Sequence, residues 1–285
     1  MSGIDPALHI RSVTLGVSDV SRSADFYEQA LGLPLITREN GSALLGADDG
    51  HPALALTQIE RPTPLPPGAT GLFHVAWLHP SRAALADTVR RLARARWPLE
   101  GASDHGVSEA IYLSDPDGLG IEVYTDRPRE RWPHTPAGGI EMVTLPLDLE
   151  DLLAQSPTEP PATIAPGTVV GHVHLKVADV ARASRFYDEQ VGFDEQARLP
   201  SAAFLGAGGY HHHIGLNSWQ SAGADRAPDT APGLREVRFE LSGGPALDEL
   251  ERRLADRGAE PHERGNELLV GDPDGQALAF VPAGS

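Results

Sequence analysis

The sequence predicts an α+β fold made of four tandem βαβββ modules, and internal repeats are the main reason. Residues 13–27 align without a gap onto residues 173–187, at an offset of 160 (173 minus 13). A second repeat places residues 71–75 over residues 233–237, at an offset of 162 (233 minus 71). In each copy an alternating apolar stretch precedes a helical pattern and further short alternating stretches, which predicts a strand, a helix and then strands.

The helix of the first module has signals at both ends. Asp19 or Ser21 can cap its N-terminus, because either side chain can accept a hydrogen bond from a free backbone N–H of the first turn. Phe26 and Leu31 are expected to face the core. Gly32 is expected to end the helix, since glycine readily adopts the left-handed conformation found there.

The second and fourth modules share a turn near their ends. Asp115 and Asp272 each begin the sequence Asp-Pro-Asp-Gly, at an offset of 157 (272 minus 115). Proline presets φ and glycine supplies a positive φ, so this sequence predicts a turn before the last strand. The fourth module is therefore five residues shorter than the second over this stretch (162 minus 157).

Proline-rich joints separate the modules and define the expected domain organisation. They lie at residues 61–68, 156–161 and 225–233. Acidic residues alternate with leucines over residues 147–153, which predicts a short helix in the connector. The expected organisation is a first pair of modules over 9–126 (9–62 and 70–126), a connector over 127–168, and a second pair over 169–282 (169–219 and 232–282).

The composition excludes several function classes. Asp and Glu number 40 against 23 Lys and Arg, and the net charge of −17 argues against binding to nucleic acid or anionic lipid. Without cysteine there is no disulfide, thiolate nucleophile or cysteine-ligated zinc. The N-terminus has no signal-peptide pattern and no apolar run reaches membrane-spanning length, so we expect a soluble cytoplasmic protein with no membrane or nucleic-acid partner.

Two histidine-rich segments lie at residues 171–175 and 210–216. In the first, valine and leucine alternate with His172 and His174, so one face of the strand is apolar and the other carries imidazoles. A neutral imidazole is the commonest side chain that holds a transition metal. The sequence therefore indicates a metal site to which another part of the chain contributes a carboxylate.

The module pattern resembles the vicinal oxygen chelate superfamily, which includes glyoxalase I, fosfomycin and bleomycin resistance proteins and type I extradiol dioxygenases. The sequence Tyr-His-His-His-Ile-Gly-Leu-Asn at 210–217, together with residues 104–118, most resembles the catechol 2,3-dioxygenase-like members. The resemblance covers nearly the whole chain except the connector. It implies that the modules pair into two curved sheets, with metal ligands on the first and last strands of each module.

These implied ligand positions determine which modules we expect to pair. They are Ser12 and Ala55 in the first module, His74 and Glu122 in the second, His172 and Gly215 in the third, and Glu236 and Ala279 in the fourth. Two histidines and one carboxylate are typical of non-haem Fe(II) oxygenases, and the second and third modules together supply His74, Glu122 and His172. We therefore hypothesise that the second module pairs with the third and the first with the fourth. Pairing of consecutive modules, as in most extradiol enzymes, is the alternative.

The resemblance also implies catalytic roles for three residues. His213 is expected on the pocket side of its strand, by parity with Gly215, as the base that removes the second proton of a catechol. His105 and Tyr112 resemble the histidine and tyrosine that hydrogen-bond substrate or ring-cleavage intermediates. His212 is expected to point the opposite way and to be structural.

The function implied by the resemblance is extradiol cleavage of a catechol-type aromatic ring with O₂ and Fe(II), or Mn(II) in its place. Homo-oligomerisation is left open. A glyoxalase-like metal-dependent lyase or isomerase is one alternative, although that chemistry usually needs a second carboxylate or glutamine, which Gly215 and Ser12 do not supply. A metal-free binding or resistance protein, with histidines lining a pocket for a small aromatic molecule, is the other.

Overall fold

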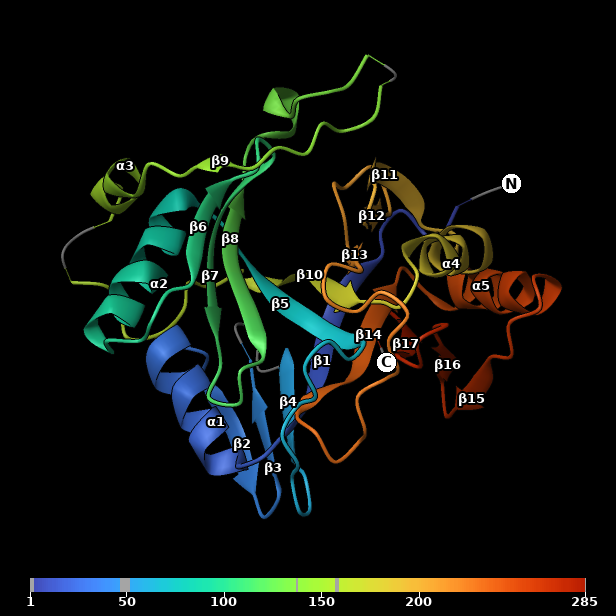
Figure 1. The fold of residues 1–285 in the computed structure, drawn as a ribbon, viewed down its shortest axis with the longest axis horizontal. Coiled ribbons are helices and arrows are strands. Elements are labelled where there is room, and N and C mark those ends of the chain that lie inside the picture. Colours follow the sequence, from blue (N-terminus) through green and yellow to red (C-terminus); the bar gives the residue numbers. More distant parts are fainter. Residues whose placement is uncertain (1–2, 47–51, 137, 157–158, 285) are drawn as a thin grey trace.

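The computed structural model of the chain describes residues 3–46, 52–136, 138–156 and 159–284. Four βαβββ modules follow one another along it, so the predicted α+β fold class is confirmed. The helices lie outside two curved sheets, with α1 and α2 on one side of the molecule and α4 and α5 on the other (Figure 1).

The four modules share one order of elements. The first contains β1 (His9–Val17), α1 (Val20–Phe26), the π-helical turn η1 (Tyr27–Leu31), β2 (Leu35–Glu39), β3 (Ser42–Leu45) and β4 (Leu54–Gln58). The second contains β5 (Gly71–His79), α2 (Arg82–Arg94), β6 (Gly101–Asp104), β7 (Ser108–Ser114) and β8 (Gly120–Asp126). The third contains β10 (Val169–Lys176), α4 (Val180–Arg185), the π-helical turn η3 (Phe186–Val191), β11 (Asp194–Leu199), β12 (Ala202–Gly206) and β13 (Ile214–Asn217). The fourth contains β14 (Gly233–Leu241), α5 (Gly244–Asp256), β15 (His262–Arg264), β16 (Glu267–Gly271) and β17 (Ala277–Pro282).

The segment between β8 and β10 contains the 3₁₀ turn η2 (Arg129–Arg131), β9 (Leu145–Pro146) and α3 (Leu149–Ala154). The short helix predicted for this segment is α3. It begins after Asp148, whose carboxylate accepts a hydrogen bond from the backbone N–H of Asp151 at 2.9 Å. In the ranges described, no helix has the length and apolar character that crossing a bilayer requires.

The modules pair in the non-consecutive way that the ligand positions predicted. β5 of the second module lies antiparallel to β10 of the third, within a nine-stranded sheet of order β11-β12-β13-β10-β5-β8-β7-β6-β9. β1 of the first module lies antiparallel to β14 of the fourth, within an eight-stranded sheet of order β15-β16-β17-β14-β1-β4-β3-β2. Figure 1 shows the two halves of the nine-stranded sheet curving away from the seam between β5 and β10.

The helix signals of the first module are present in the structure. The Asp19 carboxylate accepts a hydrogen bond from the backbone N–H of Arg22 at 3.0 Å, which caps α1. Gly32 ends η1 with a φ of 82°, in the left-handed region where residues with a Cβ are strained. Phe26 and Leu31 are buried in the core as predicted.

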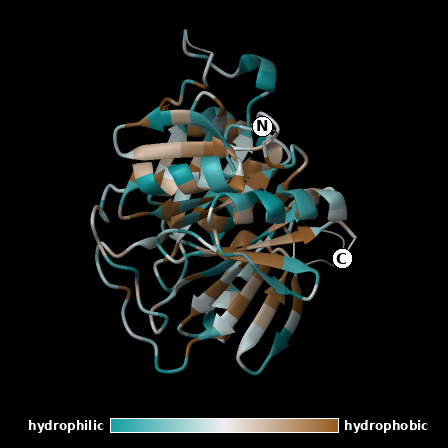
Figure 2. Ribbon diagram, turned by 90° about the vertical axis from the view of Figure 1, so that its right-hand side faces the viewer, coloured by the Kyte–Doolittle hydropathy of each residue, from teal (hydrophilic) through white to brown (hydrophobic). Residues whose placement is uncertain are grey.

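The core lies between the helices and the sheet faces that they cover. Figure 2 shows hydrophobic residues concentrated along the strands and hydrophilic residues on the loops and on much of the helical surface. On β5, Val75 and Trp77 pack into this core with Leu85 of α2. Because side chains alternate along a strand, His74 and Ala76 lie on the opposite face, which is left for the site.

Each Asp-Pro-Asp-Gly turn is organised by a buried carboxylate. Asp272 accepts hydrogen bonds from the backbone N–H groups of Asp274 at 2.9 Å and Gln276 at 2.8 Å, and from the Tyr187 hydroxyl at 3.0 Å. Burial raises the pKa of Asp272 to about 6, although these hydrogen bonds oppose the shift. Asp115 occupies the equivalent position in the second module, and burial raises its pKa to about 6 as well.

Asp272→Asn is expected to remove part of the pH dependence of stability. The carboxyl has a pKa of about 6 in the folded chain against 3.8 ordinarily, so the wild-type protein loses stability as the pH rises between these values. Asparagine keeps an acceptor for both backbone N–H groups but carries no charge. At neutral pH the variant should therefore be more stable than wild type, by up to about 3 kcal/mol, with no such advantage below the unfolded pKa.

Urea unfolding across this pH range measures the effect. Asp248→Asn on the exposed face of α5 is the matched control, because it removes one negative charge without changing a buried group. Its free energy of unfolding should differ from wild type by the same small amount at every pH. A difference for Asp272→Asn that stays constant from acid to neutral pH would refute the raised pKa.

Candidate metal centre and active site

Three adjacent strands bring the candidate metal ligands to one face of the nine-stranded sheet. Ala76 on β5 is paired with Glu122 on β8 and with His172 on β10. His74 lies two residues before Ala76 and therefore shares its face. The small side chain of Ala76 lies between Glu122 and His172 and leaves space between their longer side chains.

The three candidate ligand atoms form a compact triangle. Nε2 of His74 lies 3.0 Å from Oε2 of Glu122, Nε2 of His172 lies 3.3 Å from the same oxygen, and the two nitrogens are 3.2 Å apart. Two atoms bound at right angles to one ion, with bonds of about 2.1 Å, would lie about 3.0 Å apart. A cation inside the triangle would accept a lone pair from all three atoms, so this donor set fits a divalent transition metal.

Burial and neighbouring charges set the protonation states of Glu122 and His172 in a way that favours cation binding. His74, Glu122 and His172 are only 5%, 3% and 2% exposed. Burial acts to raise the pKa of Glu122, but His172 and His74 outweigh this effect and hold that pKa well below its ordinary value. Burial lowers the pKa of His172 to about 4, so its imidazole is neutral at neutral pH and can donate a lone pair to a metal.

A cavity of about 320 Å³ has the three candidate ligands in its wall. This volume is at the lower end of the range for small-molecule sites, which is roughly 300 to 1,000 Å³. Phe73, Phe204 and the half-exposed Trp219 give the cavity an aromatic wall suited to a flat apolar molecule. The other residues that line it include Ser103, Ser108, Met142, Val143, Thr144 and Leu199.

His105 and Tyr112 line the same cavity and form a hydrogen-bonded pair. The Tyr112 hydroxyl lies 2.7 Å from Nε2 of His105, and Nδ1 of His105 lies 2.7 Å from the carbonyl oxygen of Val143. A carbonyl only accepts, so Nδ1 of a neutral His105 carries the proton and Tyr112 donates to Nε2. Burial, with the charge of Glu122, raises the pKa of Tyr112, which keeps its hydroxyl neutral.

His213, the base expected from the sequence, lies outside this cavity. Its Nδ1 accepts a hydrogen bond from the backbone N–H of Ala207 at 3.2 Å, and its ring packs against Tyr210 with centroids 4.9 Å apart. His212 lines the cavity instead, with its ring centroid 4.1 Å from that of His172. The orientations expected for His212 and His213 are therefore both wrong.

The reason is that side-chain alternation does not extend beyond the strand. β13 begins only at Ile214, and the chain bends at His211 and His213 before it. Alternation between two faces requires extended backbone, so parity counted back from the strand fails in this segment. The preceding Gly208 and Gly209, with φ values of 58° and 70°, are the sequence signal that could have indicated a turn here.

His174 is another cavity residue for which the sequence suggested no firm role. Its Nε2 is buried and has no hydrogen-bond partner within the described part of the chain. Gly215, one of the implied ligand positions, has the His174 ring against it, and an added Cβ would lie 2.8 Å from Cγ of that ring. The missing side chain at Gly215 therefore makes room for His174, which faces His74 across the seam with ring centroids 5.0 Å apart.

In the pair formed by the first and fourth modules, the one carboxylate at an implied ligand position is Glu236, and it forms ion pairs with arginines. The Glu236 carboxylate lies 3.0 Å from a guanidinium nitrogen of Arg238 and 2.8 Å from one of Arg264. These contacts neutralise the carboxylate. Across residues 3–46, 52–136, 138–156 and 159–284, the triangle formed by the second and third modules is the only group of three histidine or acidic side chains with ligand atoms within 4.8 Å of one another.

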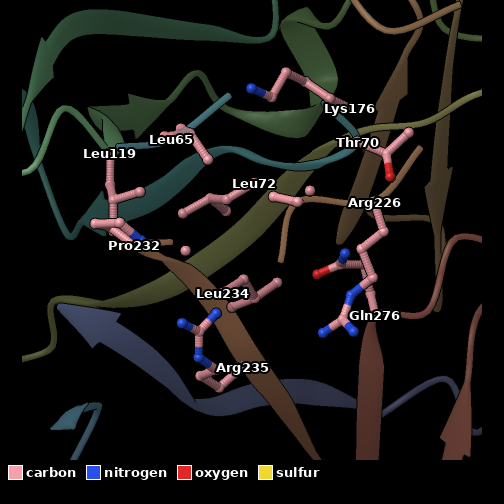
Figure 3. A pocket seen from close by; sticks show the side chains of 13 residues that line it. Leu65, Thr70, Leu72, Leu119, Lys176, Arg226, Pro232, Leu234, Arg235 and Gln276 are labelled. Atoms are coloured by element: carbon pink, nitrogen blue, oxygen red, sulfur yellow. The ribbon is translucent and has the colours of Figure 1, made fainter. Parts of the chain in front are cut away.

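A second hollow lies at the junction of the two sheets and is lined in part by Lys176, Arg226 and Arg235 (Figure 3). Its volume of about 20 Å³ is close to that needed for one water molecule. Arg235 already donates hydrogen bonds to the carbonyl oxygens of Asp229 and Ala231 at 2.9 and 2.7 Å. This hollow is too small for a substrate, whereas the cavity beside the triangle is large enough for one and is the candidate active site.

The repeated modules, their pairing and the His-Glu-His triangle define a class of protein. The sequence profile of the Glyoxalase/Bleomycin resistance protein/Dioxygenase superfamily matches residues 9–123 and 169–280. The chain belongs to this superfamily, which is the one that its module pattern resembles.

Individual relatives are consistent with this assignment. The chain is 37% identical over 285 residues to catechol-2,3-dioxygenase of Bacillus subtilis (strain 168). The aligned region covers 99% of this chain and 100% of that protein. A Bacillus subtilis structure provisionally described as a dioxygenase has a TM-score of 0.66 at 14% identity, covering 100% of this chain and 87% of its own. Glyoxalase I from Zea mays has a TM-score of 0.58 at 15% identity, and the alignment covers 97% of this chain and 92% of that structure. At these low identities the two structures establish similarity of fold alone.

Proposed function

We propose that the protein is an extradiol ring-cleaving dioxygenase that acts on a catechol-type aromatic with Fe(II) and O₂. The observation that carries this proposal is the triangle of His74, Glu122 and His172 in the wall of a cavity with aromatic side chains. Two histidines and one carboxylate are the typical ligands of non-haem Fe(II) oxygenases, because they leave positions open for substrate and O₂. The full-length similarity to catechol-2,3-dioxygenase supports the same reaction.

His74, Glu122 and His172 would hold the metal. Iron bound there would supply the redox chemistry that activates O₂. With one carboxylate and two neutral imidazoles as ligands, a divalent ion keeps a net positive charge, which favours an anionic catechol over a neutral one. Mn(II) suits the same ligands and is the alternative metal.

The surrounding side chains would position the substrate and manage its protons. Tyr112, held by His105, presents a neutral hydroxyl to the cavity. The unpartnered Nε2 of His174 offers a further hydrogen-bonding atom in the same wall. His212 takes the role that the sequence suggested for His213, namely removal of the second catechol proton, because His212 is the residue of the two that lines the cavity.

The aromatic wall would orient the ring and keep water from the reacting atoms. Phe73 packs edge-to-face against Trp219 and His174, with ring centroids 5.3 and 5.2 Å apart. Aromatic faces of this kind favour a flat ring packed against them. Displacement of water also strengthens the electrostatic interactions between the substrate oxygens and the buried polar groups.

Aerobic turnover by protein loaded anaerobically with Fe(II) tests the proposed function. Catechol should be consumed together with an equimolar amount of O₂, and a yellow product of cleavage beside the hydroxyl groups should form. Both atoms of ¹⁸O₂ should be found in that product, and the metal-free protein should be inactive. Cleavage between the hydroxyl groups, or no O₂ uptake by the iron-loaded protein, would refute the proposal. Conversion of a glutathione hemithioacetal by the metal-loaded protein would support the glyoxalase-like alternative instead.

A further inference from the structure

A chain of hydrogen bonds, buried except at Asp126, leads from the end of β8 to the cavity. Oδ1 of Asp126, the last residue of β8, lies 2.9 Å from Nε2 of His211. Nδ1 of His211 lies 2.7 Å from Nδ1 of His212, which lines the cavity. The His211 side chain is fully buried, so these two contacts account for both of its ring nitrogens. These hydrogen bonds join the second module to the third, the two modules that form the sheet with the candidate metal ligands.

The carboxylate at the start of this chain is itself held in place. The Tyr210 hydroxyl lies beside the Asp126 carboxylate and is hydrogen-bonded to the Tyr124 hydroxyl at 2.8 Å. Tyr124 can occupy this position because Gly171 has no side chain, since a Cβ there would overlap the Tyr124 hydroxyl. The His211 ring also packs on that of Tyr210, with centroids 4.1 Å apart. The network is thus fixed by packing as well as by hydrogen bonds.

The donors and acceptors in this chain determine where the protons lie. A carboxylate only accepts, so Nε2 of His211 carries a proton. When His211 is neutral this is its one N–H, so its Nδ1 accepts and the donor is the Nδ1–H of His212. Nε2 of a neutral His212 then keeps its lone pair.

We propose that Asp126 and His211 are positioning residues that fix His212 in the Nδ1–H tautomer, so that its Nε2 serves the cavity as a hydrogen-bond acceptor. The identity of the donor rests on the proposed function, since an acidic catechol hydroxyl is the group that would use this acceptor. The His212 ring packs against His172, so fixing the ring holds the acceptor beside the candidate metal ligands. The opposite tautomer would present an N–H, which cannot accept a proton from a hydroxyl.

NMR on the full-length protein tests the proposed tautomer directly. The chain is labelled with ¹⁵N-histidine and loaded with Zn(II), which is diamagnetic and suits the same ligands. Long-range ¹H–¹⁵N spectra distinguish the two tautomers, and His211→Phe and His212→Gln assign the signals by their loss. The proposal predicts Nδ1–H at His212 and Nε2–H at His211. A wild-type His212 that is Nε2–H or doubly protonated overturns it, whether or not the variants fold.

Two variants test whether these hydrogen bonds are what fixes the tautomer of His212. His211→Phe keeps ring packing against Tyr210 and Trp132 but removes the acceptor, and Asp126→Asn removes the carboxylate. In Asp126→Asn, and by the same reasoning in His211→Phe, the His212 signal should become a mixture of tautomers. Turnover should fall by about 10²- to 10⁴-fold while bound metal stays unchanged, since a general base contributes about that factor. A single unchanged tautomer in both variants overturns the positioning role.

His213→Asn is the matched control. It changes a buried histidine on the same segment that lies outside the cavity, and its amide oxygen can still accept from Ala207. Its His212 tautomer and its turnover should match wild type. The NMR tautomer and the turnover assay test the two proposals separately. If His212 is the Nδ1–H tautomer but the protein does not cleave the ring, only the proposed function is refuted. If the protein cleaves the ring but His212 is the Nε2–H tautomer, only the positioning role is refuted.

Discussion

Glu122→Ala is expected to abolish stoichiometric metal binding and ring cleavage together. The variant removes the carboxylate of the triangle and leaves two neutral imidazoles, which cannot balance the charge of a divalent ion. The turnover rate should fall by at least about a thousandfold, which corresponds to about 4 kcal/mol of lost transition-state stabilisation. Metal content after anaerobic Fe(II) loading and O₂ uptake with catechol measure the two effects. His172→Ala should behave in the same way, because it also leaves two of the three ligands.

His262→Ala is the control for these ligand variants. His262 is exposed on β15 of the eight-stranded sheet, away from the cavity, so its loss should change neither metal content nor turnover. Added Fe(II) should raise the Tm of the wild-type protein and of this control but not that of Glu122→Ala, since a ligand stabilises the fold only where it binds. Full metal occupancy in Glu122→Ala would show that the triangle is not the metal site.

His212→Ala is expected to keep the metal and to lose most of the turnover. His212 packs against His172 but is not one of the three triangle residues, so metal content should stay close to wild type. Loss of the proton acceptor should lower kcat for catechol by about 10²- to 10⁴-fold. Steady-state O₂ uptake at saturating catechol, normalised to bound iron, measures this effect.

The comparison with His213 decides between two neighbouring histidines. His213→Ala should leave kcat near the wild-type value, because the His213 ring packs with Tyr210 away from the cavity. The variant should instead be less stable than wild type by about 1–3 kcal/mol, since the backbone N–H of Ala207 loses its acceptor. If His213→Ala loses turnover at full metal content while His212→Ala does not, His213 is the base and the proposed role of His212 is wrong.

The module pairing could be predicted because the alternation of side chains is reliable inside regular strands. β5, β8 and β10 are strands of 9, 7 and 8 residues, and His74, Glu122 and His172 lie within them. Alternation therefore fixes the face on which each side chain lies. The requirement for two histidines and one carboxylate then selected the second and third modules, and the observed strand order is the one selected.

The base and its support could not be predicted in the same way. His211, His212 and His213 lie between β12 and β13, where bends determine the direction of each side chain and no periodic pattern applies. The contact between Asp126 and His211 joins residues of two modules that lie 85 positions apart in the chain. Such a contact depends on the three-dimensional pairing of the modules, and nothing in the local sequence of either residue specifies it.

Anomalous diffraction at the iron absorption edge, from crystals of anaerobically Fe(II)-loaded protein, most directly tests whether the second and third modules share one metal ion. A single peak is expected at bonding distance, about 2.1 Å, from Nε2 of His74, Nε2 of His172 and Oε2 of Glu122. An iron peak bound by other residues, with the triangle left without one, would contradict the metal centre and the ring-cleaving function built on it.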